Sequence, residues 1–420
     1  IIGFSSDTCN TMTGVNHSVF SLLKKDILHI ACIKCSCHMI NLSANKACLK
    51  LPRSVEDLIR NLGSHFNRSA KRIDAFKEFQ EFFGVKIHKI LTLAQTRWLS
   101  VEGCVDRLLE QYVPLNHYLR QTVFDDPSKT TEDMLSTMEN KFTIIYLEFM
   151  SYVLGLTTDF NVLFQSEKPL LHILKPEVEK LVKQISANYM KIDYIRSCKE
   201  ILKADFTNLD NFIDIKNIYL GIQADKSLKE IKENSNIPDS SIVDFLRTCR
   251  AFYIELVTDI VVRFDFSDPI FDIIKIVNPK VAQKFEVKSL NDVFVRFPIL
   301  CNNVDQQQAD VEWRDHALLN YDELNLDASK PPDEYWTDVF NLKNKSNVCL
   351  FPNLKIVITA LLSLPFSNAS VERAFSNLKK IKTDNRNKLN TETVSAIMIT
   401  KNGLLKNSGC IKFEPSKKND

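Results

Sequence analysis

Long stretches of the chain place apolar residues every three or four positions, which is the spacing of one face of an α-helix. The clearest stripe carries seven apolar side chains between residues 101 and 119. Similar stripes cover residues 55–83, 142–164, 176–195 and 242–264. No repeat of fixed length is visible, which disfavours a solenoid. We therefore predict an all-α region over residues 51–300.

The first fifty residues have a different pattern. A short apolar run at residues 1–5 is followed by a helical pattern at 14–25 and a second strand-like run at 27–35. Strand, helix and strand in this order form the smallest unit of a parallel sheet. Asp7 then stands at the carboxyl end of the first strand, which is where open α/β sheets place their chemistry.

The C-terminal third changes composition twice. Residues 302–340 contain ten acidic and two basic side chains, so we expect residues 301–340 to form an acidic, solvated connector. Residues 341–406 return to apolar periodicity, with a proline break at Pro365 and a capping residue, Ser367 or Asn368, before a helix that reaches about Lys382. Residues 407–420 form a polar tail.

Composition excludes several classes of function. A formal charge of +2 gives no global argument for nucleic-acid binding, and no run of about 18 apolar residues is available to cross a membrane. Nine glycines, none in a GxGxxG or GxxxxGK[ST] pattern, argue against a nucleotide or other small-molecule substrate. Eleven cysteines without a regular framework are typical of a reducing, intracellular compartment.

Four separated blocks carry a family resemblance: GFSSDTCN at 3–10, CSCHMINL at 35–42, TRWLS at 96–100 and LPFSNASVERAFSNLKKIKTDNRNKL at 364–389. In sequence and order they resemble the hAT superfamily of DNA transposases and the host proteins derived from them. The resemblance implies an α+β, predominantly α-helical fold. In that fold a partial RNase H-like domain (1–50) is interrupted by the all-α insertion, and a C-terminal dimerisation region (341–406) completes it.

The resemblance also implies an active site. Asp7 matches the second catalytic Asp of the family and Glu372 its catalytic Glu, and such carboxylates hold two Mg²⁺ ions for DNA hydrolysis and strand transfer. The first Asp of the family would precede Ile1, so we expect this chain not to cleave DNA in Mg²⁺ or Mn²⁺. Taken alone, Asp7 reads as a turn residue and Glu372 as a surface charge on a helix.

Two further pairs match family motifs. Cys35 and His38 fit a CxxH motif and are expected to support the active-site wall. No structural zinc is expected, because no second pair of ligands follows at a suitable spacing. Arg97 and Trp98 match an RW pair in which the indole can stack on a DNA base; packing of Trp98 between helices is the equally weighted alternative.

Local charge and an apolar ridge complete the candidates. Residues 46–90 carry a local charge of +5 and residues 371–401 one of +4, which suits DNA phosphates, although solvated helix faces are the commoner explanation. The apolar ridge could pack on a second copy or on the chain's own fold, and the resemblance favours a homodimer or higher homo-oligomer; its residues are Val371, Phe375, Leu378 and Ile381.

We therefore interpret the chain as a nuclear, hAT-type transposase-like protein that dimerises and binds DNA. The alternative is a domesticated, non-catalytic scaffold or transcriptional regulator that keeps the fold and the dimer contact.

Overall fold

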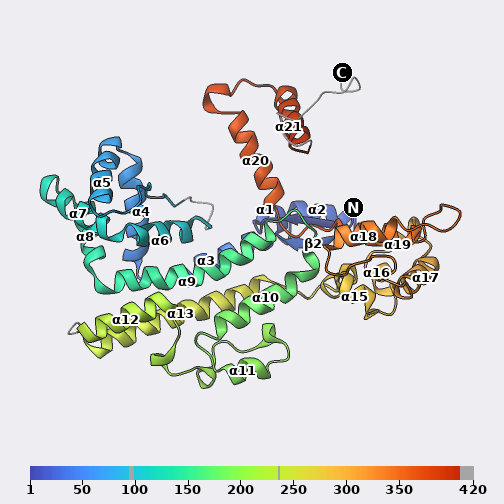
Figure 1. The fold of residues 1–420 in the computed structure, drawn as a ribbon, viewed down its shortest axis with the longest axis horizontal. Helices are drawn as coiled ribbons and strands as arrows, with labels where there is room; N and C mark the ends of the chain where they lie inside the picture. The colour runs from blue at the N-terminus through green and yellow to red at the C-terminus, as the bar shows by residue number, and fades with distance from the viewer. Residues whose placement is uncertain (94–98, 235–236, 407–420) are drawn as a thin grey trace.

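The computed structural model describes residues 1–93, 99–234 and 237–406, and it is predominantly α-helical (Figure 1). Its sheet, within these residues, has two parallel strands, β1 (Gly3–Ser6) and β2 (Ala31–Lys34), in a register that pairs Gly3 with Ala31. Two helices, α1 (Asn10–Thr13) and α2 (Val19–Asp26), connect the strands. The helical fold class and the strand–helix–strand start are confirmed, whereas two strands do not by themselves establish an RNase H-like sheet.

Four long helices form the centre of the molecule. They lie along one another in Figure 1 and are α3 (Ser36–Cys48), α9 (Lys141–Phe164), α10 (Leu171–Ser186) and α13 (Asp239–Arg263). Their facing sides are apolar, so α9 buries Phe149, Val153 and Leu154, and α13 buries Phe252, Leu256 and Val257. Within the described residues, no helix is both long and apolar enough to cross a membrane.

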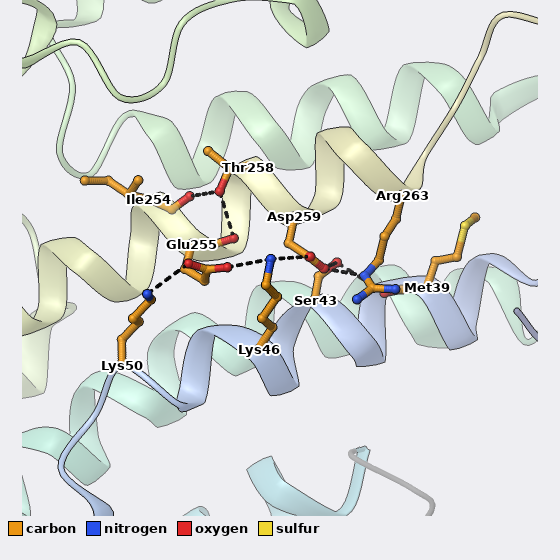
Figure 2. A network of polar contacts seen from close by, with 9 residues as sticks. All are labelled: Met39, Ser43, Lys46, Lys50, Ile254, Glu255, Thr258, Asp259 and Arg263. Atoms are coloured by element: carbon orange, nitrogen blue, oxygen red, sulfur yellow. Dashed lines mark hydrogen bonds and ion pairs between the residues drawn. The ribbon is translucent and has the colours of Figure 1, made fainter. Parts of the chain in front are cut away.

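A buried carboxylate links α3 to α13 (Figure 2). Asp259 is only 5% exposed and accepts hydrogen bonds from the Ser43 hydroxyl at 2.9 Å, the Lys46 ammonium at 3.0 Å and the Arg263 guanidinium. Lys46 also pairs with Glu255 at 2.7 Å, and Lys50 pairs with Glu255 at 3.1 Å. Burial alone would raise the pKa of Asp259, but these donors outweigh it and hold the pKa below its usual value.

Five helices pack into a cluster beside the centre, at the left of Figure 1. The stripe over residues 101–119 is divided between two helices at Gln111, just before Pro114, which has no amide hydrogen with which to continue the hydrogen bonding of α6. Gln111 is fully buried and bonds the Gln80 side chain at 2.8 Å and the Lys86 carbonyl at 3.0 Å. The cluster consists of α4 (Arg53–Asn67), α5 (Ala70–Phe82), α6 (Leu99–Glu110), α7 (Tyr112–Asp125) and α8 (Lys129–Glu139).

Residues 301–340 differ from the expected solvated connector. They contain α17 (Gln306–Ala317) and α18 (Pro332–Phe340), which bury Trp313 and Trp336. The buried carboxylate of Glu312 accepts the Leu354 amide at 2.7 Å, at the start of α19 (Pro352–Leu362). The acidic side chains lie mostly on the outer face, and this lobe also holds α14 (Ile270–Ile273), α15 (Pro279–Gln283) and α16 (Asn291–Arg296).

The remaining helices lie at the periphery. At the lower left of Figure 1, α12 (Ile222–Asn234) extends beside α13, and α11 (Ile192–Ser197) follows α10. At the top, a C-terminal arm projects from the centre and consists of α20 (Ala369–Ile381) and α21 (Thr391–Lys406).

His316 lies fully buried in the aromatic core of the α17–α19 lobe. Its ring stacks 5.9 Å from Trp313, and its Nε2 bonds the Tyr335 hydroxyl at 2.9 Å. Its Nδ1 is buried without a hydrogen-bond partner among the described residues. Burial lowers the pKa of His316 to about 4, because a protonated ring would lose its hydration.

We predict that acid destabilises this lobe through His316. Above pH ~6.5 the imidazole is neutral in both folded and unfolded chains, but below it the unfolded chain takes up the proton first, so stability falls as pH drops toward 4. At pH 5 the loss is about 2 kcal/mol. Urea unfolding followed by tryptophan fluorescence measures it, because Trp313 and Trp336 flank the ring. His316→Gln has the shallower pH slope; equal slopes for wild type and variant contradict the prediction.

Candidate functional site

Three segments that are far apart in the sequence meet at Cys35, the residue before α3. The Cys35 amide donates to the Ser6 carbonyl at 2.9 Å, at the end of β1, and the Cys35 thiol accepts the Asn368 amide at 3.2 Å, just before α20. Ser36 adds a bond from its hydroxyl to the Phe366 carbonyl at 3.1 Å. We call this set (Ser6, Cys35, Ser36, Phe366 and Asn368) the Cys35 junction.

Gly3 explains how closely the C-terminal segment approaches β1. A Cβ at this position would lie 2.6 Å from the Leu364 Cδ2 and 3.0 Å from the Pro365 Cδ. Any side chain would therefore push the 364–366 segment away from the strand. Hydrogen atoms at this position let the segment lie directly on the backbone of β1.

The Cys35 junction joins the segments that carry the two candidate catalytic carboxylates. Asp7 follows Ser6 directly, is half-buried, and accepts a long hydrogen bond from the Cys9 amide at 3.4 Å. Glu372 lies in the first turn of α20, one turn beyond Asn368, and is exposed. Its negative charge is close enough to raise the pKa of both Cys35 and Cys37.

The junction stabilises a negative sulfur at Cys35. The Asn368 amide donates to the Cys35 sulfur, and the neighbouring Cys37 thiol and His38 amide also favour its negative form, so the pKa of Cys35 falls to about 7 against the effect of burial. The neighbouring Cys35 sulfur and burial raise the pKa of Cys37, whose thiol donates to the Asn161 carbonyl at 3.7 Å. Cys35 is 1% exposed, so its role is to accept hydrogen bonds within the fold.

The remaining motif residues divide into described and undescribed positions. His38 lies half-buried on the first turn of α3, and its backbone amide faces the Cys35 sulfur. Arg97 and Trp98 lie outside the described residues. Sequence reasoning missed Gly3, Ser36 and Asn368 as junction residues. Gly3 gave a signal, since glycine is rare in this chain and rare inside strands.

The candidate site offers few side chains that could hold a metal ion. No group of three or more His, Cys, Asp or Glu side chains within the described ranges is arranged to hold a metal ion. Asp7 and Glu372 supply two of the hard oxygen ligands that Mg²⁺ prefers, which is fewer than the three carboxylates that the family resemblance implies. We derive no metal-dependent step from this pair.

The apolar ridge on α20 is only partly covered by the chain itself. Val371 and Phe375 are 50% and 59% exposed, Leu378 is half-buried, and Ile381 is buried at 8%. The base of the helix is held to the end of α9 by Arg373, which donates to the Gln165 carbonyl at 2.9 Å and pairs with Glu167 at 3.0 Å.

The two basic stretches differ in how many of their cations are paired. In residues 46–90, five cations have a carboxylate partner: Lys46, Lys50, Arg53, Arg60 and Lys77. Four exposed cations of the same stretch have no ion-pair partner among the described residues, and they are spread over residues 68–89: Arg68, Lys71, Lys86 and Lys89. In the arm, five such cations lie close together within residues 379–388: Lys379, Lys380, Lys382, Arg386 and Lys388. The arm therefore presents the more concentrated available charge.

A comparison with protein families matches the hAT family C-terminal dimerisation region to residues 323–404. The chain carries a hAT dimerisation region. This region begins in the turn after α17 and extends through α18, α19 and α20 into α21. It therefore contains the exposed ridge, Glu372 and the unpaired cations of the arm. No curated protein matches the chain.

The hAT dimerisation region starts earlier than the boundary expected from sequence, which was residue 341. The reason is structural, because α18 packs against α19 through the buried Trp336 and Val339 side chains. Residues that read as connector from their charge thus form the first helix of the matched region.

We predict that Gly3→Val loosens the contact between the hAT dimerisation region and β1. The branched side chain overlaps the Pro365 ring, which cannot rotate away, at a cost of about 1–3 kcal/mol. Native-state hydrogen exchange at the Ser36 and Asn368 amides should accelerate about tenfold or more. Gly103→Ala is the control, since its new methyl group meets only the Leu91 Cδ1, at 3.8 Å. Equal protection in both variants would refute the close approach.

Proposed function

We propose that the chain self-associates as a homodimer through α20 and binds DNA through the same arm. The observation that carries the proposal is the exposed Val371–Phe375 face in a hAT dimerisation region. An apolar face left open by its own fold is typical of a protein interface.

The geometry of α20 supports a symmetric contact. Val371, Phe375 and Leu378 are spaced by four and three residues, so they lie on one face of the helix. The helix projects from the centre, where a second copy can approach without contacting the main body (Figure 1). Pairing the same face of two copies buries both ridges about a twofold axis.

We predict that Val371→Asp with Phe375→Asp converts the dimer to a monomer. Two desolvated carboxylates replace two apolar contacts, so dimerisation weakens by at least about 3 kcal/mol, or ~100-fold. Light scattering should show the mass fall from twice the 48.3 kDa chain to one chain. Val262→Asp, which alters a residue 79% exposed on α13, is the control and keeps the dimer. A monomeric wild type would rule the interface out.

Charge on the arm supports DNA contact. Lys379 and Lys380 occupy the last turn of α20, and Lys382, Arg386 and Lys388 follow it, with Asp384 as the acid among them. Five exposed cations without ion pairs can neutralise phosphates without first breaking a native contact. In a dimer, two arms would bring two such clusters to one duplex.

We predict that replacing Lys379, Lys380, Lys382 and Arg386 by Gln weakens DNA binding equally for all sequences. Each lost phosphate contact lowers the magnitude of the slope of log K against log salt by about 0.9, so for four contacts it falls by about 3.6. Fluorescence anisotropy with a short duplex measures it. The matched control removes four ion-paired cations (Arg53, Arg60, Lys77 and Lys129 to Gln) and leaves the slope unchanged. Equal losses in both variants would contradict the assignment.

DNA association places the expected site of action in the nucleus. For the described residues we propose binding and self-association, which both a hAT-type transposase and a DNA-associated scaffold derived from one would use.

A further inference from the structure

A cleft of about 500 Å³ between α12 and the start of α13 has a basic rim. Its rim carries four exposed lysines: Lys216, Lys226, Lys229 and Lys232. Among the residues that the structure describes, Lys226 alone of these four has an ion-pair partner, a long one to Glu230 at 3.8 Å. We call this site the lysine cleft.

The floor of the lysine cleft is apolar. Ile242 and Leu246 are buried beneath it, and Leu228 and Val243 are half-buried at its sides. Asp225 and Asp239 also line it, so four cations face two carboxylates and the cleft keeps an excess positive charge. Its surface therefore suits an apolar side chain that is surrounded by acids.

Such a group exists on the same chain at the opposite end of the molecule. Leu318 follows α17 and is 82% exposed, with three exposed acids nearby in sequence: Asp315, Asp322 and Glu323. We call these four residues the Leu318 knob. The turn is fixed, because the Leu318 amide bonds the Asp315 carbonyl at 3.1 Å and the Tyr321 hydroxyl donates to the His316 carbonyl at 2.9 Å.

We infer that the Leu318 knob of one copy docks in the lysine cleft of a second copy. Leu318 packs against Leu228 and Val243 at the sides of the cleft, above the buried Ile242 and Leu246, and the acids of the knob face the lysine rim. The contact joins two different surfaces. In Figure 1, α12 and α17 lie at the two ends of the long axis, so the knob cannot reach the cleft of its own chain.

This second contact is independent of α20 and extends the assembly beyond a dimer. A contact between unlike surfaces always leaves a free knob and a free cleft at the ends of an assembly. Further copies can therefore add, and the average mass rises with protein concentration. The rim pairs are exposed and are screened by salt, so the association is weak and strongest at low ionic strength.

DNA is the competing occupant, since four lysines also attract phosphates. The apolar sides of the cleft favour the knob, because a phosphate backbone would leave the half-buried Leu228 and Val243 uncovered and gain no apolar burial. Docking of the knob and binding of DNA would respond differently when the lysines of the cleft are reversed to glutamate.

Sedimentation velocity of the full chain at low salt tests the docking. We expect the average mass to rise with concentration above the α20 dimer and to return to it at high salt. Lys229→Glu with Lys232→Glu should weaken this step at least tenfold, and Asp322→Lys with Glu323→Lys should do the same. Each variant alone fails to extend the dimer, whereas an equimolar mixture associates, because one variant supplies an intact knob and the other an intact cleft.

Controls separate this contact from the proposed dimer and from DNA binding. Lys71→Glu with Lys86→Glu makes the same charge change on exposed lysines elsewhere and leaves association unchanged. The Val371→Asp, Phe375→Asp variant loses the dimer but keeps the salt-sensitive step. Docking is overturned if the mass never exceeds the dimer, if both reversed variants associate like wild type, or if reversing the cleft lysines weakens DNA binding alone.

Discussion

A single buried carboxylate fixes the helix from which the candidate site is built. Asp259 lies on α13 and accepts hydrogen bonds from Ser43 and Lys46 of α3 and from Arg263, one turn along its own helix (Figure 2). A buried carboxylate without these donors would cost several kcal/mol, so the two helices are held in the register that brings Ser43 and Lys46 to Asp259. That register sets where the first residues of α3 lie.

The packing of α3 against α13 sets the position of the Cys35 junction. Cys35 precedes α3, so it stands where α3 places it and receives β1 through Ser6 and the hAT dimerisation region through Asn368. Sulfur suits this task because Cys35 can carry negative character, which the Asn368 amide stabilises by donating to it. Residues separated by about 330 positions therefore meet through hydrogen bonds between side chains and backbone, and these bonds fix where the segment before α20 lies.

Sequence reasoning succeeded where the signal was local. The helical stripe over 242–264 corresponds to α13, and the strand–helix–strand start corresponds to β1, α2 and β2. In both places the spacing of apolar residues directly reflects which side of the element is buried.

Sequence reasoning failed where contacts with distant parts of the chain decide whether a segment is buried. The acid-rich 301–340 segment is packed because its aromatic residues face inward while its acids mostly face outward. The meeting of Asp7 and Glu372 segments came from the family resemblance, since no local pattern encodes a contact at that separation.

Counting charges along the sequence also misjudged which surfaces are available. Residues 46–90 have the larger local charge, yet Lys46 and Lys50 serve the internal link to α13 and three other cations have partners within their helices. Lys229, Lys232 and the arm lysines lie in stretches of smaller excess charge but face solvent without ion pairs. Availability depends on pairing in three dimensions, because a cation already facing a carboxylate must lose that contact before it binds another. A chain of formal charge +2 can thus present basic surfaces at α20 and α12 and an acidic one beside α17, and it is this separation, rather than net charge, that gives the molecule several distinct faces for association.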